Sequence, residues 1–239
     1  MKLEVCVADP QSLAAAIDGG AERIELCSAL ELGGLTPLPG LMALAAETGV
    51  ETLALIRPRS GDFVLDGHDL DAMLRDIAAV RQAGLAGVVL GANRADGTLD
   101  GAVLARLLDE ADGLGTTLHR AIDLVPDFAE ATEMAIALGF DRILTSGGAP
   151  TALEGLGQLA LVHATARGRI SVMAGAGLRP DNVLDLLAVV PVDEVHSSCA
   201  GEPRASAEGA VRLGFAAKSR RHTDAEVVRA FRETLAGLV

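Results

Sequence analysis

The chain has 239 residues, is half hydrophobic and carries a formal net charge of −13. This acidity argues against a nucleic-acid partner, which needs a basic surface, and the absence of Trp and Tyr removes the usual platforms for stacking bases. No apolar run approaches the roughly 20 residues of a membrane span, and the N-terminal stretch MKLEVCVADP is not typical of a signal peptide. Three widely spaced cysteines do not form a disulfide framework, so we expect a cytoplasmic protein.

Short strand-like runs alternate with Ala- and Leu-rich helical stretches along the whole chain. The first run is Leu3–Val7, and Asp9-Pro10 then supplies an N-cap and a first-turn proline for a helix that Gly19-Gly20 closes. The later strand-like runs are Arg23–Cys27, Thr52–Arg57, Gly87–Gly91, Thr116–Arg120, Arg142–Thr145, Ile170–Ala174 and Glu194–His196. The later helices are expected to begin at Pro37 or Pro39, Asp69, Asp100, Asp127 or Phe128, Thr151, Pro180 and Thr223, the last running to Val239.

Strict alternation of eight strands and eight helices predicts a parallel sheet closed into a (β/α)8 TIM barrel, as a single domain over residues 1–239. A doubly wound open sheet is the alternative, but no glycine fingerprint follows the first strand. Residues 197–222 form the one long connection, which we interpret as a lid or an interface.

The first two predicted strands carry charged residues on a face that a barrel buries away from water. Ile24 and Leu26 suit the layer of helices, so the residues that alternate with them must face the barrel interior. These inward residues are Arg23, Glu25 and Cys27, and by the same alternation Glu4 and Cys6. Buried charges need partners, so Arg23 and Glu4 form either an ion-pair network that closes the barrel floor or part of a functional site.

Polar residues and glycines also follow the ends of the later strands. The carboxyl ends of barrel strands meet at one mouth, which is where TIM-barrel active sites lie. The sequence therefore predicts a ligand site at this mouth. Arg57, Arg59 and Arg120 offer planar forks for a carboxylate or a phosphate.

Two further groups of residues belong to this predicted site. Turns after the sixth and seventh strands expose backbone N–H groups suited to an anion, and they contain Ser146, Gly147, Gly175 and Gly177. The candidate acids and bases are Glu25, His119, Asp123 and His196. Together these residues favour a small anionic ligand.

Six stretches of the chain resemble the CutC family, which is named for copper homeostasis. They are IELCSALELGGLTP, IRPRSGDF, LHRAID, ILTSGG, MAGAG and EVHSS, and the resemblance as a whole runs from about Leu3 to Ser198. The resemblance implies a cytoplasmic TIM barrel that is usually a homo-oligomer. It also implies a copper(I) site at the inward thiols Cys6 and Cys27.

Two classes of function are thus left open by the sequence. Thiolates suit Cu(I), which favours a copper-binding homeostasis protein. Three arginines beside the thiols would repel a cation, which favours a TIM-barrel enzyme (a lyase, isomerase or hydrolase) acting on a small phosphorylated or carboxylated metabolite. The two roles can coexist in one mouth.

Overall fold

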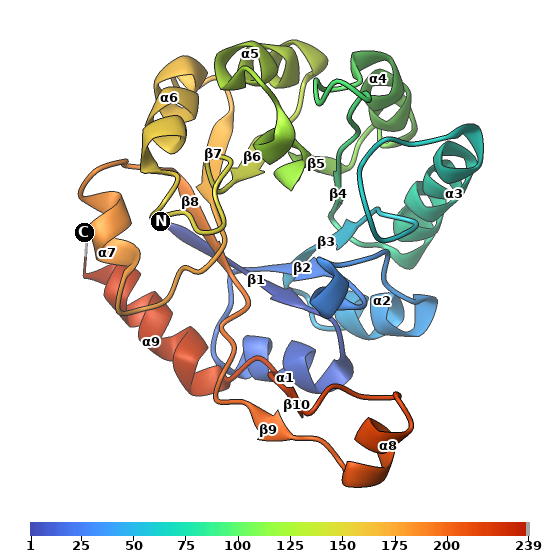
Figure 1. The fold of residues 1–239 in the computed structure, drawn as a ribbon, viewed down its shortest axis with the longest axis vertical. Coiled ribbons are helices and arrows are strands. Elements are labelled where there is room, and N and C mark those ends of the chain that lie inside the picture. Colours follow the sequence, from blue (N-terminus) through green and yellow to red (C-terminus); the bar gives the residue numbers. More distant parts are fainter. Residues whose placement is uncertain (238–239) are drawn as a thin grey trace.

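The computed structural model describes residues 1–237 and shows a closed barrel of eight parallel strands ringed by helices (Figure 1). Each strand pairs with the next in the sequence, and the eighth pairs with the first. The strands are β1 Lys2–Val7, β2 Arg23–Leu26, β3 Glu51–Leu55, β4 Gly87–Leu90, β5 Gly115–Leu118, β6 Arg142–Thr145, β7 Ser171–Ala174 and β8 Glu194–Ser197. The predicted TIM barrel is confirmed.

The helices follow the expected order with shifts at several ends. They are α1 Pro10–Asp18, α2 Pro39–Ala46, α3 Gly67–Ala83, α4 Gly101–Glu110, α5 Phe128–Leu138, α6 Leu156–Ala166, α7 Val183–Leu187, α8 Glu208–Arg212 and α9 Ala225–Ala236. Within the described residues, no helix is long and apolar enough to cross a membrane. The expected continuation of the last helix to Val239 lies outside the described residues.

Several predicted boundaries were wrong; helix α7, for example, begins at Val183 and not at Pro180. Three others have clear local reasons. Asp69 does not begin α3; it is the third residue of the helix, and its side chain completes a capping box with the N-cap residue Asp66. Helix α6 begins at Leu156 and not at Thr151, because a turn before it brings Gly155 against the backbone of Ser146, where a Cβ atom would clash. Strand β5 ends at Leu118, since His119 caps the short 3-10 helix η2, Arg120–Leu124.

The barrel strands separate two apolar regions, one between the strands and the helices and one inside the barrel. Leu3, Val5, Ile24 and Leu26 belong to the large apolar cluster between the strands and the helices. Cys6 and Cys27 belong instead to a small cluster inside the barrel, with Leu53, Leu55 and Val89. Glu4 is completely buried as well. The predicted inward orientation of these acids and thiols is therefore confirmed.

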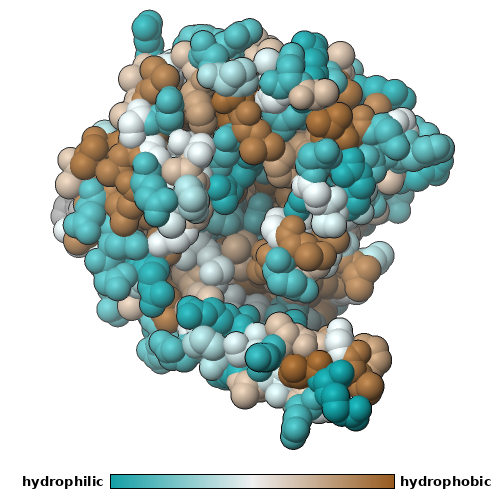
Figure 2. All heavy atoms as spheres, in the orientation of Figure 1, coloured by the Kyte–Doolittle hydropathy of each residue, from teal (hydrophilic) through white to brown (hydrophobic). Residues whose placement is uncertain are grey.

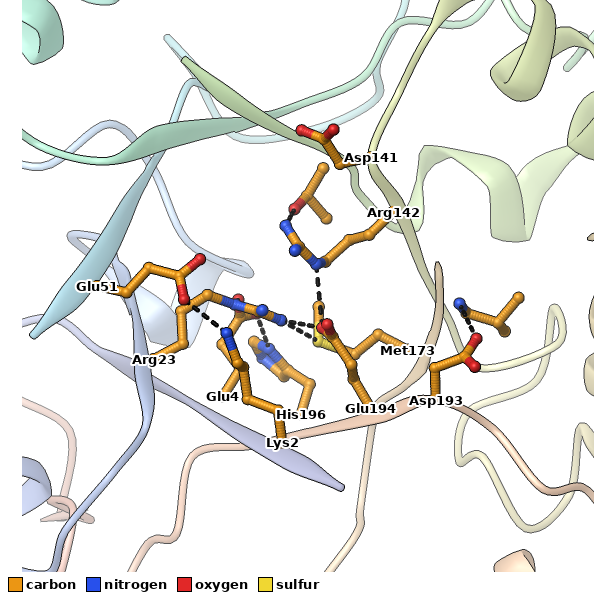
Figure 3. Close-up of polar contacts among 12 residues, drawn as sticks. Lys2, Glu4, Arg23, Glu51, Asp141, Arg142, Met173, Asp193, Glu194 and His196 are labelled. Carbon is orange, nitrogen blue, oxygen red and sulfur yellow. Dashed lines mark hydrogen bonds and ion pairs between the residues drawn. The ribbon is translucent and has the colours of Figure 1, made fainter. Parts of the chain in front are cut away.

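A buried ion-pair network closes the floor of the barrel (Figure 3). Arg23 on β2 donates from Nε to Glu4 Oε2 on β1 at 2.5 Å and also pairs with Glu194 on β8. Arg142 on β6 donates to the same Glu194 oxygen at 3.0 Å. The network thus joins β1, β2, β6 and β8. This agrees with the interpretation that Arg23 and Glu4 form an ion-pair network at the barrel floor.

The connection after β8 folds into a separate projection, which we call the arm, residues 201–222. It contains an antiparallel ribbon of β9, Arg204–Ala205, and β10, Ser219–Arg220, and the helix α8 between them. Its base is narrow, because Gly201 N–H donates to His222 O at 3.0 Å. Figure 2 shows the arm as a lobe with hydrophobic residues, beside a hollow near the centre of that face. Phe215, a residue of the arm, is 82% exposed.

Candidate functional site at the barrel mouth

A cavity of about 370 Å³ opens at the carboxyl ends of the strands. It brings together seven residues that the sequence predicted for the site, namely Cys6, Glu25, Arg57, His119, Arg120, Gly177 and His196. Six other predicted residues are not among those that line it, namely Cys27, Arg59, Asp123, Ser146, Gly147 and Gly175. The predicted site therefore divides into residues that can meet a ligand and residues behind them.

One wall of the cavity holds a cluster of three possible metal ligands. Strand register places Cys6 beside Glu25, and β8 brings His196 to the other side of β1. One ligand atom of each residue lies within 4.8 Å of the other two. His196 Nδ1 lies 2.8 Å from Glu4 Oε1, which fixes the ring, and His196 Nε2 lies 3.7 Å from Glu25 Oε2. The floor network thus orients the histidine of the site.

Burial and charge shift the pKa values of this cluster in different directions. Burial acts to raise the pKa of Glu4, but the hydrogen bond and charge of His196 and the charge of Arg23 outweigh it, leaving a pKa of about 2. Burial, together with the charge of Glu4, raises the pKa of Glu25. Burial acts to lower the pKa of His196, yet the negative charges of Cys6 and Glu25 raise it well above its usual value. His196 and Glu25, whose pKa values are both raised, thus lie side by side and can exchange a proton.

Cys27 does not lie beside Cys6, as a site shared by the two thiols would require. The register pairs Cys6 with Glu25, so the two thiols are not at matched heights. The Cys27 sulfur lies 3.4 Å from Glu25 Oε2, and burial raises its pKa well above the usual thiol value. Cys27 therefore contacts the three-residue cluster through the carboxylate of Glu25.

Arg57 is a second buried charge that lines the cavity. It lies beyond β3, not within it as predicted, since the ladder has ended before Pro58. Its Nη1 donates to Leu32 O at 3.0 Å and to Gly34 O at 2.9 Å, and its Nη2 donates to Gly61 O at 2.7 Å. Burial and the neighbouring Arg59 lower its pKa. Backbone carbonyls therefore hold its position without neutralising its charge.

His119 lies beside Arg57 as a neutral donor. Its Nδ1 accepts a hydrogen bond from Ala121 N–H at 3.1 Å, so the ring proton is on Nε2. Burial and the charge of Arg57 lower its pKa to about 3. Phe63 packs on the ring with centroids 4.7 Å apart, and a side chain at Gly91 would clash with it. The imidazole is therefore fixed by its surroundings.

Arg120 reaches the cavity from η2 on a rigid support. Its Nε donates to Asp123 Oδ2 at 2.6 Å, and its Nη2 donates to Ser146 Oγ at 2.7 Å. Asp123 also accepts from Thr145 Oγ1 at 2.5 Å and from the Ser146 and Gly148 N–H groups. Asp123 and Ser146 thus position Arg120 and the turn after β6, with the carboxylate directed at these donors.

The other predicted residues outside the cavity have structural contacts of their own. Arg59 pairs with Asp69 at 2.9 Å and with Asp62 at 3.2 Å, on the outer side of the rim. A Cβ atom at Gly147 would clash with the Gly155 backbone. A Cβ atom at Gly175 would lie 2.7 Å from Leu144 and 3.3 Å from the His196 Cβ. Gly175 therefore lets β7 pack closely behind the histidine of the cluster.

Several lining residues were not predicted as part of the site. They are chiefly Phe63, Cys199 and Arg221. Arg221 comes from the base of the arm, where Arg220-Arg221 in an acidic chain was an available signal. Phe63 had none, because its role depends on how the loop after β3 folds over His119. Cys199 is buried, and burial raises its pKa to about 12.

Comparison with known proteins gives a consistent result. The family model described as the CutC family matches residues 1–201. A CutC family protein of Sinorhizobium medicae is 57% identical over 236 residues, covering 99% of this chain and 96% of the relative. A CutC family protein of Caulobacter vibrioides is 54% identical over 239 residues, covering 96% of each chain.

Solved structures agree with the sequence matches. The structure described as a copper homeostasis protein CutC from Streptococcus agalactiae superposes with a TM-score of 0.79 at 28% identity, covering 83% of this chain and 98% of that one. Thiamine phosphate pyrophosphorylase from Pyrococcus furiosus, at 17% identity and a TM-score of 0.59 over all of this chain and 96% of that one, shares the fold alone. With a family match over most of its length and relatives above 50% identity, the chain belongs to the CutC family.

Proposed function

We propose that the chain binds a copper(I) ion at the barrel mouth, as part of copper homeostasis. The observation that carries this proposal is the grouping of Cys6, Glu25 and His196, with one ligand atom of each within 4.8 Å of the other two. The name of the structural relative from Streptococcus agalactiae points the same way. Copper is the cargo in this proposal, and no further chemistry is assigned to it.

The donor set fits a soft or borderline metal ion. A thiolate and an imidazole are ligands that Cu(I) accepts, while the Glu25 carboxylate is a harder ligand that also suits Zn(II). The contact between Glu4 and His196 Nδ1 is the outer-shell arrangement that orients metal-binding histidines. Cys27 lies close enough to Glu25 to take part after losing its proton, so the predicted role of both thiols stays part of the proposal.

Competitive titration of the reduced protein with Cu(I) against a chromophoric chelator tests this function. We expect Cys6→Ser to weaken Cu(I) affinity by tenfold or more, because the softest ligand is lost. Cys199→Ser is the matched control, since that thiol lines the same cavity outside the three-residue cluster, and its affinity should equal the wild type. Cys27→Ser decides whether the second thiol participates.

Two results would contradict the copper proposal. One is a wild-type protein that binds Zn(II) but takes no Cu(I) from the chelator. The other is an equal loss of affinity in Cys6→Ser and Cys199→Ser, which would mean that any cysteine near the mouth contributes. All titrations need an anaerobic reductant so that the thiols stay reduced.

An enzyme acting on a small anionic metabolite is the second candidate function. The cavity is far larger than a metal ion needs, and Glu25 and two histidines line it together with four arginines. In this role Glu25 and His196 would move protons, with His119 as a neutral hydrogen-bond donor. Incubation with a metabolite extract, followed by mass spectrometry of substrate loss in wild type and Glu25→Gln, tests it; equal loss in both would contradict it.

A further inference from the structure

The mouth cavity has a strongly cationic lining for an acidic protein. Its lining residues in the described part of the chain include Arg57, Arg120, Arg179 and Arg221, whereas Glu25 is the one acid among them. Arg120 and Arg179 are partly neutralised by Asp123 and Asp181. No ion pair in residues 1–237 includes Arg57, which is only 8% exposed. A buried, unpaired charge of this kind is unfavourable unless a ligand compensates it.

Two buried N–H groups of this wall also lack an acceptor. Arg57 Nε and His119 Nε2 have no hydrogen-bond partner among the described residues. His119 is 5% exposed, and its proton is on Nε2 because Nδ1 accepts from Ala121. A buried donor without a partner destabilises a protein, because its hydrogen bonds to water have been lost and not replaced. Neither group is free to turn away, because three carbonyls hold Arg57 and Phe63 packs on both residues.

We propose that the wall formed by Arg57 and His119 is an oxyanion subsite, which receives the carboxylate or phosphate group of a small metabolite. An oxyanion accepts hydrogen bonds from both N–H groups and compensates the charge of Arg57. Arg120 lies at the edge of the same cavity and adds a second guanidinium. The rest of the ligand then extends toward Cys6, Glu25 and His196, which line the same cavity.

The subsite adds to the second proposed function, the enzyme, the chemical group that is bound. It rests on that function only in assuming that the bound metabolite then reacts. It does not require a metal ion. If an oxyanion binds and no metabolite is consumed, the subsite stands and the enzyme proposal fails. If no oxyanion binds, the subsite is wrong whatever reaction the protein performs.

Thermal unfolding with inorganic phosphate or malonate, each matched in ionic strength with sodium chloride, is the first test. A ligand that binds the folded state raises the unfolding midpoint in proportion to its occupancy. We expect at least one probe to raise the wild-type midpoint above the chloride control. A response to phosphate alone indicates a phosphorylated ligand, and a response to malonate alone indicates a carboxylated one. No response to either probe would overturn the proposal.

Matched arginine variants locate the site. Arg57→Gln should weaken binding more than tenfold, since removing one partner of a buried charged contact is costly. Arg59→Gln should bind as the wild type does, because Arg59 pairs with Asp62 and Asp69 outside the cavity. Equal weakening in both variants would show that a general surface field binds the anion, and would refute the subsite.

Histidine variants test the second donor. His119→Asn keeps an acceptor near the Nδ1 position for the Ala121 N–H and removes the outer donor, so its affinity should fall. His119→Gln returns a donor near the Nε2 position and should recover part of the loss. Wild-type NMR serves where a variant does not fold: phosphate, and not chloride, should shift the His119 Nε2–H resonance. An unchanged resonance at saturating phosphate would reject this donor.

Discussion

At the scale of single residues, His119 should make the stability of the protein depend on pH. Its pKa is about 3 in the folded protein and about 6.5 when exposed, because burial and Arg57 oppose its protonation. A lowered pKa means that the unfolded chain binds the proton more readily. The stabilisation is therefore fully present above pH 6.5 and is lost as the pH falls toward 3.

The measurement is the free energy of unfolding of wild type and His119→Asn at two pH values. Between pH 7.5 and pH 5 the free energy of unfolding of the wild type should fall by roughly 2 kcal/mol more than that of the variant. The variant has no imidazole at position 119 to titrate. The comparison cancels the titration of the other groups. A parallel pH dependence in both proteins would mean that His119 protonates normally in the folded state.

At the scale of elements, the arm should be separable from the barrel. Its two ends are already joined by the Gly201–His222 hydrogen bond and the antiparallel bridge of Ala200 with Thr223. Replacing residues 202–221 by an Asn-Gly turn should therefore change the free energy of unfolding by no more than about 1 kcal/mol. Chemical denaturation checks this, and loss of cooperative folding would show that the arm is part of the core.

Helix α9, which follows the arm, supplies the contrasting control. Phe231 on this helix is completely buried, and Phe231→Ala should cost about 3–5 kcal/mol. Size-exclusion chromatography of the arm replacement also addresses the predicted role of this segment. A smaller assembly than the wild type supports an interface, and an unchanged assembly leaves the lid interpretation.

At the scale of the whole molecule, the floor network should be necessary for closure of the barrel. Arg23 has no exposed surface and joins β1, β2 and β8 through Glu4 and Glu194. Arg23→Met removes the cation that Glu4 and Glu194 share, leaving His196 as the partner of Glu4 and Arg142 as the partner of Glu194, and should destabilise the protein by about 3–5 kcal/mol. Arg169→Met removes an exposed pair with Glu133 and should cost less than about 1 kcal/mol.

Denaturant unfolding of both variants measures this difference. Adding Glu4→Gln and Glu194→Gln to Arg23→Met should recover part of the lost stability, because the uncompensated charges are then gone. If Arg23→Met is as mild as Arg169→Met, the network does not contribute to closure, and the floor residues are available for another role.

Several features of this protein were determined by the sequence alone. The eightfold alternation of strand-like and helical stretches predicted the barrel, because eight such units in one domain are typical of a closed parallel sheet and no glycine fingerprint favoured an open one. The period of two in the first strands placed Glu4, Cys6 and Glu25 inside, since one face of each strand must meet the helices. Seven predicted residues in the strands or just after them line the mouth for a related reason: parallel strands end on one side.

Other features were decided only by the tertiary structure. Register across strands far apart in the sequence grouped Cys6 with Glu25 and His196, where pattern alone had matched Cys6 with Cys27. Loop folding left Arg57 beside His119 without an acid, and turned Arg59 outward to its own acids. Alternation fixes the face on which a side chain lies, but its height, its partners and its access to the cavity depend on contacts between distant segments.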